Sequence, residues 1–261
     1  MPSLLHLFSV VPPPRLQAAC QLGILGAGVQ VAGPSVAGDA PSGPNRDPEV
    51  ALREFLRSIV LTQGRQQIPY ASEAHRLVTE LQEDPSGSSY AAADCATALH
   101  ELNRSLDTLL ASVSPSHRAS VAAGAGIVRV DESWTQSRAS LGHGHRTSRP
   151  LLREVTTATR VTGLHGAVAH GMLGAILGLP RDAVLDAYAY STARGAVNAA
   201  TRLNLVGPQR AVAIQTELAE VAIEIADSSQ FLRLDKAAGV SPILDTVHCA
   251  HDVLELRLFR T

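Results

Sequence analysis

Aromatic residues are scarce in this chain. Phenylalanine, tryptophan and tyrosine make up 3% of its 261 residues, although 45% of the residues are hydrophobic. The apolar content is therefore largely alanine, leucine and valine. Small aliphatic side chains suit closely packed helices, and alanine has the highest helix propensity. No apolar run is long enough to cross a bilayer, so we expect no membrane association through a spanning segment.

Cysteine and net charge are also low. Cys20, Cys95 and Cys249 are far apart and form no C-x-x-C pair, which argues against a disulfide scaffold or a structural zinc site. We expect three small buried side chains in a reducing compartment, and a cytoplasmic protein. The formal net charge of −2 gives no reason to expect nucleic acid or an anionic membrane as a partner.

Sequence signatures of common enzymes are missing. There is no G-x-S-x-G nucleophile turn and no G-x-x-x-x-G-K-[ST] phosphate loop. Gly23, Gly26 and Gly28 have the wrong spacing for a dinucleotide loop and lack the strand–loop–helix context. Nucleophilic catalysis and a GTPase role therefore find little support in the sequence, and we single out no catalytic residue.

Helical periodicity dominates from residue 48 onward, and no stretch alternates as a strand does. We predict an all-α multi-helix bundle of roughly eight to ten helices over residues 48–261. Residues 1–47 are predicted to be a poorly ordered N-terminal segment that ends in a Gly/Pro-rich linker. Helices are expected at 48–60 and 72–81, with a separation between them. Gly178 and Gly207 are predicted helix stops, each followed closely by a proline that starts the next helix.

The helix predicted at 180–205 is rich in alanine, serine and glycine. Small side chains let a second helix approach closely. This pattern favours a central core helix, and the alternative is a contact between two copies of the chain.

Three pairs of histidines are candidate ligands. His143 and His145 lie in a polar stretch where solvated loop residues are the simpler interpretation, although imidazole suits nickel and zinc. His165 and His170 are five residues apart, so they do not share a helical face. His248 and His251 are three apart on the final predicted helix. The weak metal candidates are His143, His145 and His165.

Three segments carry a resemblance to a known family. They are residues 241–261, SPILDTVHCAHDVLELRLFRT; residues 199–208, AATRLNLVGP; and residues 165–186, where Leu177-Gly178-Leu179 precedes a helix. Together they resemble the urease accessory protein F (UreF) family in its plant or algal form. The early G-G-F-x-x-S-x-G-L-E-like motif of that family is missing here.

The resemblance implies a UreF-like bundle and a non-enzymatic accessory protein. Such proteins assist nickel insertion into apo-urease by scaffolding a UreD/UreH-type protein and the GTPase UreG, and they are usually dimers. The resemblance implies no cofactor held by this chain, and it leaves open whether nickel contacts it. Carried over to this sequence, the implied partner-binding residues are Arg202, Gly207, Pro208, His251, Arg257, Leu258 and Phe259.

Two alternatives come from other functional classes. One is an all-helical metal-dependent enzyme whose site uses His165, His170 and nearby carboxylates. The other is a helical interaction module unrelated to nickel.

Overall fold

A computed structural model describes residues 48–84, 89–139, 149–159 and 163–249 of the chain. Over these ranges it contains eight α-helices, one 3-10 helix and no strand, which confirms the predicted all-α bundle. The elements are α3 (Pro48–Glu83), α4 (Ser89–Leu110), α5 (Ser114–Ala139), α6 (Arg149–Ala158), α7 (Gly166–Ile176), α8 (Arg181–Arg202), α9 (Pro208–Ser229), η2 (Leu234–Lys236) and α10 (Pro242–Cys249). None of these helices combines the length and the apolar character needed to traverse a lipid bilayer. The predicted N-terminal segment, 1–47, lies outside the described residues.

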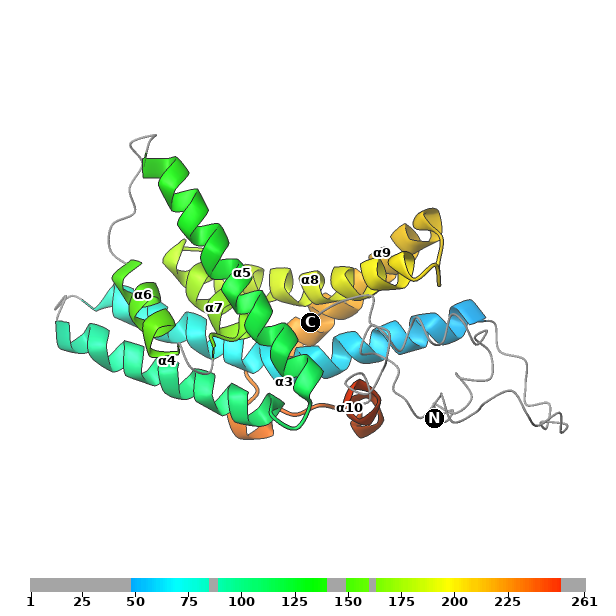
Figure 1. Cartoon of the computed structure of the whole chain (residues 1–261), viewed down its shortest axis with the longest axis horizontal. Helices are drawn as coiled ribbons and strands as arrows, with labels where there is room; N and C mark the ends of the chain where they lie inside the picture. The colour runs from blue at the N-terminus through cyan, green and yellow to red at the C-terminus, as the bar shows by residue number, and fades with distance from the viewer. Residues whose placement is uncertain (1–47, 85–88, 140–148, 160–162, 250–261) are drawn as a thin grey trace, which may run out of the picture.

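The long helix α3 runs through the middle of the bundle (Figure 1). It packs against α7, α8 and α9 and also contacts α4. Arg53 Nη1 donates to both carboxylate oxygens of Glu217, at 2.7 and 2.8 Å, and links α3 to α9. Further along, the Ser72 hydroxyl donates to the Gln230 carbonyl oxygen, which follows the last residue of α9 (2.9 Å). The helix thus contacts segments that lie more than 150 residues away in the sequence.

The predicted separation between helices at 48–60 and 72–81 is wrong, because α3 is continuous through Pro69. A proline inside a helix removes one backbone hydrogen bond and costs roughly 3 kcal/mol or more. Here its neighbours Ile68, Tyr70, Ala71 and Ala74 are all buried in the core. The burial of these neighbours outweighs the free-energy cost of a proline inside the helix.

The innermost helix is α7, not the alanine-rich α8. Eight of the 11 residues of α7 are buried, and a Cβ added to Gly171 would lie 2.1 Å from the Ala71 carbonyl oxygen of α3. Side chains larger than hydrogen would force the two helices apart. In α8, Ala189, Ala193 and Ala200 are buried while Gly195 is exposed, so the small residues cover one packed face and one open face.

Two helices end at a residue in the left-handed backbone conformation. Gly178 has φ +70° and Asn204 has φ +55°, both in the left-handed region. At the end of α8, the Asn204 N–H donates to the Thr201 carbonyl oxygen and the Leu205 N–H to that of Ala200, which is a Schellman arrangement. The predicted stop at Gly178 is confirmed. The stop predicted at Gly207 is wrong, because α8 already ends at Arg202 and Gly207 is the N-cap of α9.

The short helix α10 contacts the beginning of α5. Leu244 is buried, and the Cys249 thiol donates to the Ser112 carbonyl oxygen (3.3 Å). Cys249 is exposed, contrary to the expectation of buried cysteines, because α10 presents only one face to the bundle. Cys95 is buried as expected, and burial raises the pKa of its thiol to about 11. Cys20 lies outside the described residues.

Candidate functional site

Three potential ligand side chains from three elements converge at one point of the bundle. Asp107 lies near the end of α4, His117 in the first turns of α5, and His165 at the N-cap of α7. The Asp107 Oδ1 atom is 2.6 Å from His117 Nε2 and 3.3 Å from His165 Nε2. The two imidazole rings meet edge to face with their centroids 5.2 Å apart. We call these three residues the Asp107 cluster.

The loop before α7 is fixed from α4, which positions His165. The Asn103 side chain accepts a hydrogen bond from the His165 backbone N–H (2.9 Å) and donates one to the Gly163 carbonyl oxygen (2.8 Å). On the other side of the ring, His165 Nδ1 is 3.1 Å from the Ser120 hydroxyl of α5. Asn103, Ser120 and His165 are all buried. The imidazole of His165 therefore has both nitrogens committed and little freedom to rotate.

Burial and charge act in opposite directions on this cluster. Burial lowers the pKa of His165, and the hydrogen bond to Asp107 offsets only part of that effect. Partial burial acts to raise the pKa of Asp107, but hydrogen bonds from His117 and His165 outweigh it and bring the pKa below its usual value. At neutral pH, Asp107 is thus an ionised acceptor and His165 a neutral imidazole. Because a carboxylate only accepts, both Nε2 atoms carry the hydrogen.

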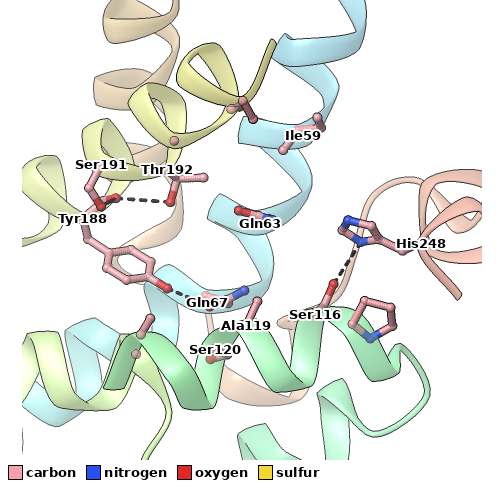
Figure 2. Close-up of a pocket in the computed structure, with 16 residues that line it drawn as sticks. Ile59, Gln63, Gln67, Ser116, Ala119, Ser120, Tyr188, Ser191, Thr192 and His248 are labelled. Carbon is pink, nitrogen blue, oxygen red and sulfur yellow. Dashed lines mark hydrogen bonds between the residues drawn. The ribbon is translucent and has the colours of Figure 1, made fainter. Parts of the chain in front are cut away.

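An open groove of about 420 Å³ lies beside the cluster, and Ser120 belongs to its wall. Its lining comes from α3, α5, α8 and α10, with Gly166 at the start of α7. In Figure 2, the Tyr188 ring points toward Gln67, and Ser116 points toward His248. The Tyr188 hydroxyl donates to Gln67 Oε1 (2.6 Å), and Ser116 Oγ is 2.9 Å from His248 Nδ1.

The groove wall is largely apolar with scattered polar groups, and none of the described residues that line it is a carboxylate, a lysine or an arginine. Serine, threonine, glutamine and tyrosine groups alternate with alanine and glycine along it. The Tyr188 pKa is raised by burial, so its hydroxyl stays protonated. Such a surface can accept the backbone and uncharged side chains of a peptide segment, and the His248 imidazole is the one described group on it that can carry a positive charge.

The predicted site residues are distributed over different places. Arg202, Gly207 and Pro208 lie exposed at the turn between α8 and α9 and belong neither to the cluster nor to the groove wall. His165 is in the cluster. His170 instead bonds the Val184 carbonyl oxygen through Nε2 (3.1 Å) and packs near Tyr188. The two histidines that the enzyme alternative would combine therefore have different partners. The remaining predicted residues, His143, His145, His251, Arg257, Leu258 and Phe259, lie outside the described residues.

Asp107 and His117 were missed at the level of sequence. They are ten residues apart, on either side of the short connection at 111–113 between α4 and α5. An antiparallel helix pair brings such positions together, and that spacing is the one signal that points to them. The approach of His165, almost 50 residues further on, depends on the packing of α7 and has no local signature.

Comparison with known proteins identifies the family. A family model described as UreF matches residues 47–219, which is well over half of the chain and includes α3 to α8 with the first part of α9. The chain belongs to the UreF family. The family resemblance seen in the sequence is thereby confirmed. The matched range begins earlier than the sequence motifs suggested, and it does not extend to the C-terminal string.

Several named relatives are similar to this UreF chain. A protein named Urease accessory protein F from Oryza sativa subsp. indica is 26% identical over 210 residues, which cover 80% of this chain and 71% of the relative. A protein of the same name from Arabidopsis thaliana is 28% identical over 160 residues, 61% of this chain and 63% of the relative. The Urease accessory protein UreF of Allorhizobium ampelinum is 28% identical over 126 residues, 48% of this chain and 55% of the relative. No solved structure matches the chain.

Proposed function

We propose that this protein is a non-enzymatic urease accessory protein that assists nickel insertion into apo-urease. The observation that carries the proposal is the UreF family match over residues 47–219. The names of the relatives from rice and Arabidopsis add support, since each is a urease accessory protein F. In this role the helical bundle works in the cytoplasm as a scaffold, joining a UreD/UreH-type protein and a UreG-type GTPase to apo-urease. It acts as a homodimer.

The turn between α8 and α9 is the proposed partner contact within the described residues. Arg202 is the last residue of α8, and Gly207 and Pro208 begin α9; all three are exposed. A Cβ added to Gly207 would meet no atom within 4 Å, and its φ of −72° is open to any residue. A side chain can therefore be introduced there without disturbing the fold. The C-terminal residues His251, Arg257, Leu258 and Phe259 complete the proposed contact.

Reconstitution tests the accessory role directly. The full chain is co-purified with a UreD/UreH-type protein and a UreG-type GTPase, and apo-urease is then activated with nickel and GTP. We expect a complex that raises urease activity above that of the same mixture without this chain. A well-folded protein that forms no complex and leaves activation unchanged would overturn the proposal.

Two variants locate the partner contact. Gly207→Arg and deletion of Arg257–Thr261 should each weaken binding of the UreG-type partner while leaving the helical content unchanged. Gly126→Arg is the matched control, because a Cβ at Gly126 of α5 also meets nothing within 4 Å. If Gly207→Arg and Gly126→Arg bind the partner equally well, the turn is not the contact.

The same assay judges the two alternatives. A metal-dependent enzyme would act without partners and would lose activity on substitution of His170. A helical interaction module unrelated to nickel would bind partners without changing urease activation.

A further inference from the structure

We propose that Asp107, His117 and His165 bind a divalent first-row transition-metal ion on this chain itself. The ligand atoms of the three side chains all lie within 4.8 Å of one another, and they come from α4, α5 and the N-cap of α7. This inference deepens the proposed function by placing an ion on the accessory protein. The proposed function decides only which ion occupies the site in the cell, and the existence of the site does not depend on it.

The spacing of the ligand atoms suits a small cation. Ions such as Zn²⁺ bind imidazole nitrogen and carboxylate oxygen at about 2.0–2.2 Å, which puts neighbouring ligand atoms roughly 3–3.5 Å apart. The Asp107–His165 pair, at 3.3 Å, already has this separation, and the Asp107–His117 pair, at 2.6 Å, has to open by a few tenths of an ångström. Two imidazoles and one carboxylate favour nickel, zinc, cobalt or copper over magnesium or calcium.

The surroundings of His165 are those of an oriented metal ligand. A ligating histidine commonly has its other ring nitrogen hydrogen-bonded, and this partner fixes the ring. Ser120 Oγ lies 3.1 Å from His165 Nδ1, and Asn103 holds the His165 backbone. Ligation through Nε2 requires the tautomer of His165 with its hydrogen on Nδ1, and the Ser120 hydroxyl oxygen is placed to accept that hydrogen.

The site is closed on one side and accessible on the other. The His165 side chain is fully buried, whereas those of Asp107 and His117 are 25% and 27% exposed. Three protein ligands leave at least one position for water or for a ligand from another molecule. An ion held in this way can be exchanged, unlike one enclosed by four protein ligands.

The competing explanation is a hydrogen-bonded cluster that joins three helices and binds no ion. Asp107→Asn separates the two explanations, because an amide oxygen still accepts from both imidazoles but is a much poorer metal ligand. Ser120→Ala is a milder second variant that leaves all three ligands in place. His143→Ala/His145→Ala serves as the control, since it removes the two weak metal candidates of the sequence that are not in the cluster.

The experiment titrates the metal-free full chain with Ni²⁺ by calorimetry and with Co²⁺ by visible absorption. We expect one ion per chain at the cluster and cobalt d–d bands typical of nitrogen and oxygen ligation. Changes in outer-shell partners typically cost 10–100-fold in affinity, so Ser120→Ala should weaken binding by about that factor and Asp107→Asn by at least as much. The control double variant should keep the high-affinity binding and the cobalt spectrum.

Binding by Asp107→Asn with unaltered affinity and spectrum would overturn the proposal, as would the absence of binding by the folded, unaltered protein. Circular dichroism of the metal-free proteins verifies that each variant is folded. The titration needs no partner, so it is decided separately from the accessory role. If the complex activates urease while the isolated chain binds no ion, only this inference fails.

Discussion

At the scale of single residues, two glycines of α5 differ sharply in what surrounds them. A Cβ on Gly124 would lie 1.9 Å from the Leu164 carbonyl oxygen, whereas a Cβ on Gly126 would meet nothing within 4 Å. The close approach of α5 to the loop before α7 therefore depends on Gly124. That approach also sets the position of the neighbouring His165. The geometry of the Asp107 cluster therefore depends on the absence of a side chain at Gly124.

Alanine at these two positions should have opposite effects on stability. Gly124→Ala forces a backbone shift and should lower the free energy of unfolding by about 1–3 kcal/mol. Gly126→Ala removes chain entropy from the unfolded state and should raise it by up to about 1 kcal/mol. Urea unfolding of both variants measures the difference. Equal stabilities would show that the α5–α7 contact is looser than described.

His170 predicts a pH dependence of stability. Burial lowers its pKa below the ordinary value of 6.5, and the hydrogen bond to Val184 offsets this only in part. The unfolded chain thus takes up a proton below about pH 6.5 while the native protein does not. Stability is fully present above this pH and falls as the pH drops, by at most about 1.4 kcal/mol per pH unit for one proton.

His170→Gln should remove the contribution of one proton to the slope of the unfolding free energy against pH, because glutamine does not titrate. Glutamine can still donate to the Val184 carbonyl oxygen, so the native hydrogen bond is kept. Urea unfolding in the presence of a chelator between pH 7.5 and 5 supplies the measurement. An identical slope in both proteins would contradict a neutral, partly buried His170.

At the scale of elements, the end of α8 depends on one left-handed residue. Asn204 has φ +55°, and its N–H donates to the Thr201 carbonyl oxygen in the turn that terminates the helix. Asparagine tolerates this conformation, whereas a β-branched residue does not. Asn204→Val should cost about 1–2 kcal/mol, and Asn204→Gly should change stability by only a few tenths of a kcal/mol. Thermal unfolding distinguishes them, and similar losses in the two variants would rule out a conformational cause.

Helix existence was largely predictable from the sequence, because periodicity and terminator residues act locally. The stop at Gly178 follows from such a signal. The failures have non-local causes: α3 continues through Pro69 because its neighbours are buried, and α7 is innermost because Gly171 lets it reach α3. Of the three cluster residues, only His165 was a candidate from the sequence. Asp107 and His117 could not be predicted, because they come together only when α4 and α5 pack as an antiparallel pair.

At the scale of the whole molecule, the family match begins at residue 47, directly before α3. A chain beginning at Pro48 should therefore keep its helical signal and its unfolding temperature. A 1 kcal/mol change would move the unfolding temperature of a domain of this size by about 2–4 °C, so a shift below that is expected. A larger loss would show that residues 1–47 contribute to the fold, against the predicted domain boundary.

The central position of α3 has a consequence for synthesis on the ribosome. The helix is translated before every other described element, yet α7 begins about 80 residues after α3 ends. At 5–20 residues per second, its apolar face waits roughly 4–16 seconds for that partner. During this interval Phe55, Leu56 and Ile68 have no α7, α8 or α9 to cover them. Slowing translation between α3 and α7 prolongs this exposure and should lower the yield of folded protein.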